Sequence, residues 1–283
     1  MNEVCSAFNI HRSSFCLRAS VSLWRTMMNP DQSAVREYWQ LRPCGADEPR
    51  MVSSSAEFFD AYARIRYERE PEIEGFAEFR RWAGCRVLEV GVGMGADFVR
   101  FAKVGAKIVG TDLASRSLEL ARHNAETNLL APTLLNADAQ ALPFTAGAFD
   151  LAYSWGVLHH TPDTECAVRE IHRVLRPGGE CRVMLYHCRS LVALQCYLRY
   201  GLGGLRPFNS ISELIARNLE SPGTKAFTRG EAKTLFNQFR SVEIRPVVTA
   251  YDVRLGRRRF APRWVRRLAP SRVGWFLLIR AQK

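Results

Sequence analysis

The stretch RVLEVGVGMGAD, residues 86–97, decides how the rest of the chain is interpreted. An apolar run closes on the carboxylate of Glu89, and Gly91, Gly93 and Gly95 follow at every second position. The order of an apolar run, glycines and then an amphipathic segment predicts a strand, a tight turn and a helix. Glycines permit a sharp turn and a close approach of ligand to main-chain N–H groups, so the turn is expected to hold a nucleotide-type cofactor.

Taken alone, this glycine turn fits more than one kind of cofactor. Gly91, Gly93 and Ala96 also match the dinucleotide pattern G-x-G-x-x-G/A, and Asp112 lies at about the distance of a ribose-binding acid. The turn therefore leaves a nicotinamide or flavin cofactor and S-adenosylmethionine equally open, with a plain packing turn as a third interpretation.

Length and composition favour one α/β domain with additions to it. A chain of 283 residues can bury a substantial core. No apolar run approaches the roughly 20 residues that cross a bilayer. The eight cysteines contain no C-x-x-C pair and are interpreted as reduced thiols of a cytoplasmic protein. They suggest no metal site.

Strand-like and helix-like segments alternate after the turn. Strands are expected at 107–111, 133–136, 149–154 and 180–186, and the helix before the last of these is expected to stop at Pro177-Gly178-Gly179. This alternation predicts an α/β fold with a doubly wound, parallel sheet whose ligands lie beyond the carboxyl ends of the strands. Glu89, Asp112 and Asp138 would then meet at that edge.

The N-terminal part divides in two. Residues 1–30 lack periodicity and are expected to be a disordered extension, without the apolar core of a secretory signal. Residues 31–82 are helical in pattern and rich in aromatic side chains, and they are expected to form a helical lid over the cofactor cleft or to pack on an edge of the sheet.

Six motifs in order make the sequence similar to the class I S-adenosylmethionine-dependent methyltransferases, in the quinone-type (type 11) branch. They are LEVGVGMG at 88–95, GTDL at 110–113, DAQALPF at 138–144, FD at 149–150, GVLHH at 156–160 and RVLRPGG at 173–179. The resemblance implies a seven-stranded, mostly parallel sheet in a domain spanning 83–283. Its last two strands would be 241–249 and 274–281, one of them antiparallel, with insertions at 187–240 and 252–272.

The resemblance also implies S-adenosylmethionine as the cofactor and a role for each matching residue. Its ammonium would lie near Glu89 and its methionine part against the glycines, bordered by Ser154 and Trp155. Asp112 would accept hydrogen bonds from both ribose hydroxyls, and Leu113 would pack beside the adenine. Asp138 and the Ala139 N–H would bind the adenine edge. The predicted cofactor-binding residues are therefore Glu89, Gly91, Gly93, Gly95, Asp112, Leu113, Asp138, Ala139, Ser154 and Trp155.

Three histidines follow strands on the cleft side and are candidates for removing a proton from an acceptor. His159 and His160 follow the fourth strand and His187 the fifth, and imidazole titrates near neutrality. His159 and His160 are therefore the candidate catalytic residues. The alternative, that they only shape their loop, stays open.

The acceptor is a small molecule in the favoured interpretation. After the fourth strand the chain has Ser-Trp-Gly-Val at 154–157, not the Asn/Asp-Pro-Pro-aromatic element of amino-group methyltransferases that act on nucleobases. An apolar insertion at 187–240 would overhang the cleft and favours an apolar metabolite or lipid precursor, methylated on oxygen or carbon. A nicotinamide-dependent oxidoreductase and a non-catalytic S-adenosylmethionine-binding protein are the alternatives.

Basic residues concentrate near the C-terminal end. Eight arginines stand between Asp252 and Arg272, in a chain with a formal charge of +12. With aromatic side chains between them, this segment (254–272) is interpreted as a solvated basic face or as a peripheral contact with an anionic membrane surface. A nucleic-acid surface is the least favoured hypothesis, because nothing in the segment reads bases. The sequence does not indicate an oligomeric state.

Overall fold

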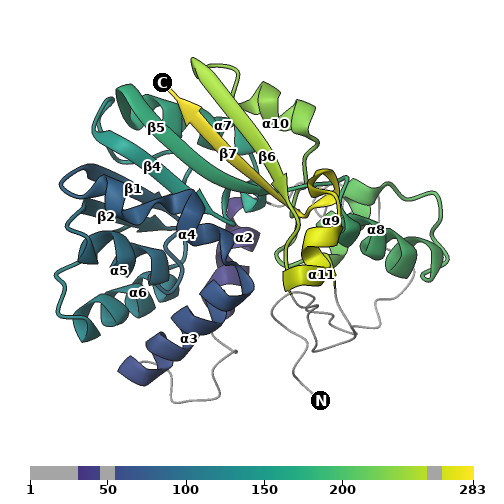
Figure 1. Cartoon of the computed structure of the whole chain (residues 1–283), viewed down its shortest axis with the longest axis horizontal. Coiled ribbons are helices and arrows are strands. Elements are labelled where there is room, and N and C mark those ends of the chain that lie inside the picture. The colour runs from purple at the N-terminus through teal and green to yellow at the C-terminus, as the bar shows by residue number, and fades with distance from the viewer. Residues whose placement is uncertain (1–30, 45–54, 254–262) are drawn as a thin grey trace.

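The computed structural model describes residues 31–44, 55–253 and 263–283. The predicted extension at 1–30 and the first part of the basic segment, 254–262, lie outside the described residues. One sheet organises the described part (Figure 1). Its strands are β1 (Arg86–Val90), β2 (Lys107–Asp112), β3 (Thr133–Asn136), β4 (Phe149–Trp155), β5 (Leu175–Tyr186), β6 (Ser241–Val247) and β7 (Phe276–Gln282).

The strand order is β3-β2-β1-β4-β5-β7-β6. Strands β1 to β5 pair in parallel, whereas β7 lies between β5 and β6 and runs antiparallel to both. The predicted seven-stranded, doubly wound and mostly parallel sheet is therefore confirmed. The reversal of direction from β1 toward β2 on one side and β4 on the other marks the switch point, where ligands bind in such sheets.

Helices cover both faces of the sheet (Figure 1). They are α2 (Gln32–Leu41), α3 (Ala56–Arg69), α4 (Glu72–Ala77), η1 (Phe79–Trp82), α5 (Ala96–Lys103), α6 (Ser115–Thr127), η2 (Leu158–His160), α7 (Thr164–Val174), α8 (Leu191–Cys196), η3 (Tyr197–Leu202), α9 (Ile211–Asn218), α10 (Arg229–Leu235), α11 (Arg263–Leu268) and η4 (Ser271–Val273).

Alternating side chains of the strands feed two separate hydrophobic layers. Val87 and Leu151 face the layer that includes Phe98 and Phe101 of α5. Leu88 faces the opposite layer, which includes the inner side of α7. Because successive strand residues point to opposite faces, a strand covered on both sides is buried almost throughout, as β1 is from Val87 to Val90.

The boundary between α7 and β5 differs from the prediction. The helix ends at Val174 and β5 begins at the next residue, so Pro177 and the two glycines lie inside the strand segment and not at the helix end. Proline disfavours helical geometry in the residue before it, here Arg176, so the helix stops earlier. Gly178 has φ +75°, which accommodates the irregular pairing between β4 and β5 in this region.

The described parts of the N-terminal region, 31–44 and 55–82, contain four helical segments. α3 packs against the glycine turn, since Phe58, Phe59 and Tyr62 contact Met94 and Ala96. Ser55 caps this helix by accepting a hydrogen bond from the Phe58 N–H at 3.1 Å. The glycine turn is thus covered by α3, which is separated from it in the chain by α4, η1 and β1.

The region after β5 forms a helical lobe beside the sheet, made of α8, η3 and α9 (Figure 1). α8 is capped by Ser190, whose hydroxyl accepts from the Ala193 N–H at 3.1 Å, and it packs on α9 through Val192 and Leu214. Within the described ranges, every helix is too short or too polar to traverse a bilayer.

Candidate functional site

A cavity lies at the carboxyl edge of the sheet and crosses its switch point. Asp138 after β3, Asp112 at the end of β2 and Glu89 in β1 line one part of it. Trp155 at the end of β4 and Tyr186 at the end of β5 line the other part. The strand order therefore separates a carboxylate-rich half of the cavity from an aromatic half.

The glycine turn folds through its own backbone hydrogen bonds. The Gly91 N–H donates to Thr111 O at 2.7 Å, the Gly95 N–H to Val92 O at 2.8 Å, and the Gly93 N–H to Asp112 Oδ2 at 3.0 Å. All three glycines have positive φ, between +52° and +82°. Contrary to the simple expectation, these N–H groups are engaged inside the protein, and the glycines provide the turn and the space around it.

The three glycines differ in what surrounds them. A Cβ at Gly93 would meet nothing within 4 Å, which leaves open space on the cavity side. A Cβ at Gly91 would lie 2.2 Å from Val157 Cγ2, and one at Gly95 would lie 3.0 Å from Ala121 Cβ. Gly95 does not line the cavity and instead permits close packing of α5 on α6, so this predicted cofactor contact has a packing role here.

Asp112 joins the turn to β2. Its Oδ2 accepts from Gly93 and its Oδ1 accepts from the Ala114 N–H at 2.9 Å. Burial raises the pKa of this carboxyl to about 6, although the bonds from Ala114 and Gly93 act in the opposite direction. Each carboxylate oxygen keeps a further lone pair, so Asp112 can accept additional hydroxyl donors from the cavity.

Glu89 presents an unsatisfied carboxylate to the cavity. Its side chain is 3% exposed, and Oε2 has no hydrogen-bond partner. Burial, together with the nearby Asp97 and Asp112 carboxylates, raises its pKa well above the ordinary value. A buried acceptor without a donor is costly, and a cationic ligand group at this point would relieve the cost.

The other predicted cofactor residues divide into two groups. Leu113, Asp138, Ala139 and Trp155 line the cavity. Ser154 does not, because its hydroxyl is fully buried and donates to Val90 O at 2.9 Å. Ser154 therefore links β4 to β1 beneath the cavity and does not itself line it.

These residues fit S-adenosylmethionine. The unsatisfied Glu89 carboxylate suits an ammonium, and Asp112 suits a pair of ribose hydroxyls. The open side of Gly93 leaves room between them. The fit rests on the donor and acceptor chemistry of the carboxylate-rich half of the cavity.

Asp97, the last residue of the opening stretch, is a cavity residue that the prediction missed. It is 2% exposed and accepts hydrogen bonds from Arg66 at 2.8 Å, from the Tyr67 hydroxyl at 2.8 Å and from the Tyr153 hydroxyl at 2.9 Å. These three donors come from α3 and β4, so one carboxylate in α5 ties the covering helix to the sheet. An acid directly after the glycines was the available signal.

Glu70 is a second missed carboxylate, at the end of α3. It accepts from Trp155 Nε1 at 2.8 Å and from the Tyr251 hydroxyl at 3.0 Å, and Arg66 Nη1 lies 3.7 Å away. Burial raises its pKa above the ordinary value. It orients Trp155 at the boundary between the two halves of the cavity.

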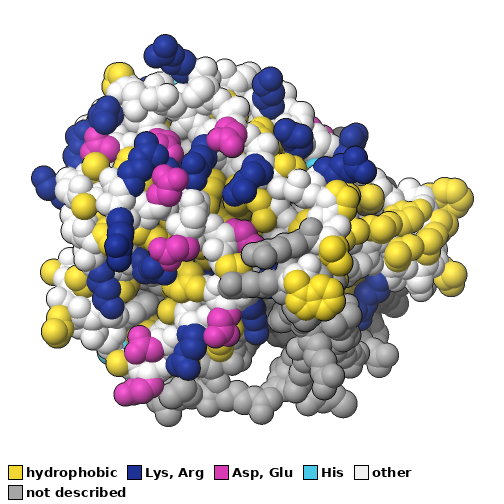
Figure 2. Space-filling model, viewed as in Figure 1, with side chains coloured by type: hydrophobic (Ala, Val, Ile, Leu, Met, Phe, Trp, Pro, Cys, Tyr) yellow, Lys and Arg dark blue, Asp and Glu magenta, His cyan; other side chains and the backbone are white. Residues whose placement is uncertain are grey.

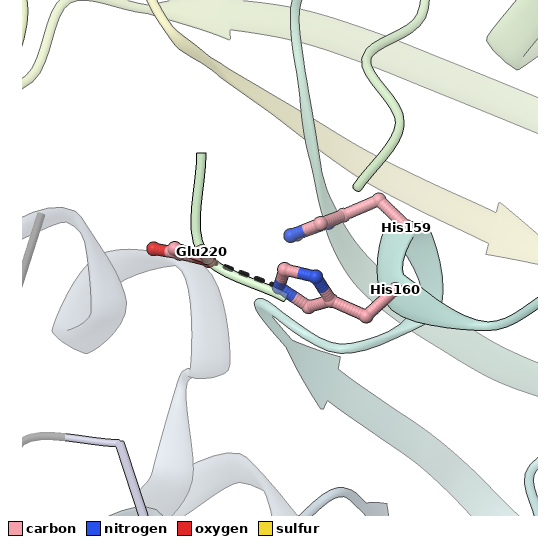
Figure 3. Close-up of side chains that lie close together, drawn as sticks. All are labelled: His159, His160 and Glu220. Carbon is pink, nitrogen blue, oxygen red and sulfur yellow. Dashed lines mark ion pairs between the residues drawn. The ribbon is translucent and has the colours of Figure 1, made fainter. Parts of the chain in front are cut away.

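The two candidate catalytic histidines have different surroundings (Figure 3). His159 is fully buried, stacks on the Tyr186 ring at a centroid distance of 3.8 Å and does not line the cavity. Burial lowers its pKa well below the ordinary value, which keeps the ring neutral. His159 is thus placed for packing, whereas His160 lines the cavity.

Both ring nitrogens of His160 have polar neighbours, although only Nδ1 has a hydrogen-bond partner. Nδ1 lies 2.8 Å from Ser221 Oγ and 3.0 Å from Thr224 Oγ1, and Nε2 lies 3.0 Å from Glu220 Oε2 (Figure 3). Glu220 also lines the cavity and accepts from the Tyr186 hydroxyl at 2.9 Å. No signal in the sequence indicated Glu220, which reaches the site from the loop after α9.

The ligand atoms of His159, His160 and Glu220 lie within 4.8 Å of one another, a spacing at which such groups can hold a metal ion. The contacts of His160 with Glu220 and of Glu220 with Tyr186 already account for two of these side chains. His187, the third histidine considered, is buried with Nδ1 at 3.0 Å from Gly274 O and is not part of the cavity lining.

The aromatic half of the cavity is built mainly by apolar rings. Trp275 stacks on Tyr186 at 4.3 Å between centroids, and Phe276 contacts Trp155 at 5.6 Å. Trp39 from α2 lies edge-on to His160 at 5.0 Å. The polar groups in this half are few and include His160 and Glu220, so it suits a flat apolar molecule with one polar atom.

Comparisons with known proteins agree with this geometry. Residues 88–183 match the family model described as "Methyltransferase domain" (Methyltransf_11). A demethylmenaquinone methyltransferase of Thermus thermophilus is 40% identical over 132 residues, covering 42% of this chain and 60% of that protein. A ubiquinone biosynthesis O-methyltransferase of Ruegeria pomeroyi is 35% identical over 100 residues, covering 35% of this chain and 40% of that protein.

An uncharacterised protein of Mycobacterium tuberculosis is 37% identical over 107 residues, and the match covers 38% of this chain and 39% of that protein. The chain therefore matches less than two thirds of the length of these relatives. Among solved structures, magnesium protoporphyrin IX methyltransferase from Synechocystis has a TM-score of 0.57 at 14% identity, over 89% of this chain and all of that one. At this identity the likeness concerns the fold.

The family match spans β1 to β5, which carry the carboxylate-rich half of the cavity, and it favours S-adenosylmethionine over a dinucleotide at the glycine turn. Over residues 88–183 the chain is similar to class I S-adenosylmethionine-dependent methyltransferases of the type 11 branch, and this similarity supports S-adenosylmethionine as the cofactor.

Proposed function

We propose that the chain transfers a methyl group from S-adenosylmethionine to a small, apolar acceptor, a metabolite or lipid precursor, at an oxygen or carbon atom. The observation that carries the proposal is the two-part cavity, with carboxylates at one end and aromatic rings around His160 and Glu220 at the other. When bound, S-adenosylmethionine supplies a methyl group on a positively charged sulfur. The relatives named for menaquinone and ubiquinone biosynthesis support an acceptor of this class.

The residues of the cavity would act mainly by positioning. Asp112 and Glu89 would fix the cofactor, and Trp155, oriented by Glu70, would border the methionine end. The aromatic half would exclude water and hold the acceptor against that border. Such alignment of two reactants is a large source of rate in group transfer.

His160 is the proposed acceptor of the proton that the substrate releases. It lines the cavity, and Glu220 at 3.0 Å from Nε2 would stabilise the imidazolium that forms. His159, the other candidate, is neutral, buried and without a face on the cavity, so we assign it to the packing of Tyr186. Replacing His160 by Gln should lower turnover about 100-fold or more and leave cofactor affinity unchanged. Equal turnover in the variant would remove the proton-transfer role.

The acceptor is found by incubating the purified chain with radiolabelled S-adenosylmethionine and a cell extract. The proposal expects label in the fraction that organic solvent extracts, and about thirtyfold less label with Asp112→Ala at a cofactor concentration below the dissociation constant. Label in protein or nucleic acid would contradict the acceptor class. Tight cofactor binding without labelling of any fraction would favour a non-catalytic S-adenosylmethionine-binding protein.

Contact of segment 254–272 with an anionic membrane surface remains part of the proposal. Residues 254–262 are outside the described residues, so the support comes from sequence: eight arginines and no acidic residue after Asp252. A lipid-phase acceptor would make such a contact useful.

A further inference from the structure

A row of large apolar side chains is exposed on the helical lobe after β5. It consists of Leu194, Leu198 and Leu202, each about half exposed, and of Leu205 and Phe208, which are 91% and 99% exposed. We call these five residues the leucine ridge. Singly exposed apolar side chains are ordinary, but five within fifteen residues mark an interaction surface.

The spacing explains why the ridge is on one side of the lobe. Leu194, Leu198 and Leu202 recur at every fourth position through α8 and η3, which places them along one side of these consecutive helical turns. The opposite side of α8 is also apolar, since Val192 and Cys196 are buried against the domain. A helix with apolar residues on both sides has a second face that requires a partner.

α11 adds a second exposed apolar group. Trp264 is 66% and Leu268 75% exposed. Figure 2 shows hydrophobic side chains over the α8–η3 lobe and over α11 on the same face of the molecule. A tryptophan with its ring exposed beside leucines is typical of segments that lie in the interface of a membrane.

The segment that carries the leucine ridge has charged side chains of one sign. Residues 188–212 contain three arginines, Arg189, Arg199 and Arg206, and no acidic residue. All three are exposed, as is Arg272 beside α11. A partner must therefore be both apolar and anionic. A second copy of this chain would bring like charges together across a twofold interface, so charge complementarity favours anionic lipid.

We propose that the leucine ridge, with Trp264 and Leu268 of α11, docks the protein on the surface of an anionic lipid bilayer. The apolar side chains enter the boundary between headgroups and acyl chains, and the exposed arginines contact lipid phosphates. The proposal deepens the membrane contact proposed above and assigns it to residues outside the sequence segment first considered. It does not depend on methyl transfer, because the test reads lipid binding.

α8 connects this surface to the cavity. Val192 lines the cavity, whereas Leu194, two residues later in the same helix, is on the exposed ridge. The cavity wall and the docking surface are thus opposite sides of one helix. Docking would bring the aromatic half of the cavity to within about one helix diameter of the bilayer, roughly 10 Å.

The test is co-sedimentation of the full chain with vesicles of phosphatidylcholine alone or mixed with phosphatidylglycerol. Binding is expected to the mixed vesicles and to weaken as salt rises. The triple variant Leu198→Glu/Leu202→Glu/Phe208→Glu should bind at least about tenfold more weakly. The matched control is Leu129→Glu, a leucine that is 95% exposed at the end of α6, and it should bind as the parent does.

Cofactor affinity of each variant, measured by calorimetry, verifies that the fold is retained. If the parent chain fails to bind the mixed vesicles, the proposal is overturned. It is also overturned if Leu129→Glu weakens vesicle binding as much as the triple variant does. Light scattering provides a second check: a dimer of the parent that the triple variant abolishes would make the ridge an interface between copies and not a lipid surface.

Discussion

At the scale of single residues, Asp112 shows how one carboxylate serves both fold and site. It accepts from the backbone at Gly93 and Ala114, so it closes the turn before any ligand is considered. Its position at the end of β2 was predictable, because the ends of parallel strands meet at one edge. Its double role was not, since hydrogen bonds within a turn leave no periodic trace in the sequence.

Replacing Asp112 by Ala should weaken S-adenosylmethionine binding by about 2 kcal/mol or more, roughly thirtyfold, because hydroxyl acceptors are lost in a buried site. Isothermal titration measures the change. The matched control is Asp150→Ala, an aspartate at the other end of the sheet that pairs with Arg86 and Arg176, and it should bind as the parent does. Unchanged affinity in Asp112→Ala would refute the assigned ribose position.

The raised pKa of Asp112, about 6, gives the binding a pH dependence. A protonated carboxyl accepts fewer hydrogen bonds, so affinity should be highest above pH 6 and fall by up to about tenfold per pH unit below it. In the free protein, burying this charge lowers the free energy of unfolding, and that penalty decreases as the pH falls from about 6 toward the ordinary value of 3.8. Asp112→Asn should lack the dependence; a variant that keeps it would assign the titration to another group, such as Glu89.

Other residues show the limits of sequence reasoning at this scale. Gly95 and Ser154 match the family pattern, yet one packs against Ala121 and the other donates to Val90. A motif records which residue types recur, but it does not separate contact with a ligand from support of the turn. Glu220 is in a loop 60 residues after His160 in the chain. Only the fold brings its carboxylate next to the imidazole of His160.

At the scale of elements, α3 is held to the sheet by buried polar groups as well as apolar packing. Arg66 and Tyr67 donate to Asp97 in α5, and Tyr153 of β4 donates to the same carboxylate. The alternation of strands and helices made the sheet predictable. The seat of α3 over the glycine turn was not, because aromatic helices pack equally well on many apolar surfaces.

Asp97→Ala should destabilise the fold by about 3 kcal/mol, because it removes the buried carboxylate that accepts from Arg66, Tyr67 and Tyr153. Urea unfolding measures the effect. Glu165→Ala is the control, since its ion pair with Arg169 is exposed and should contribute less than about 1 kcal/mol. A loss in Asp97→Ala no larger than in the control would show that the α3 contact is held by its apolar side chains alone.

At the scale of the whole molecule, the cavity is assembled from distant parts of the chain: Trp39 in α2, the turn after β1, Tyr186 in β5 and Trp275 before β7. A ligand that fills it touches nearly every layer of the fold. Binding should therefore oppose global unfolding and not only local motion.

A concentration of S-adenosylmethionine 100 times its dissociation constant should raise the free energy of unfolding by about 2.7 kcal/mol. Thermal and urea unfolding with and without the cofactor measure the increase. NAD at the same concentration is the control and should leave stability unchanged. Stabilisation by NAD would restore the dinucleotide interpretation of the glycine turn.

The antiparallel strand β7 has a consequence for biosynthesis. It fills the space between β5 and β6 and pairs with β5 from Glu180 to Tyr186 and with β6 along its whole length, although it follows both in the chain. On the ribosome, the first five strands can associate as they emerge, but β5 keeps an open edge and β6 lacks any partner until residues 276–282 have been translated. The nascent chain thus passes through a stage with unpaired strand edges, the state in which chaperones are most needed.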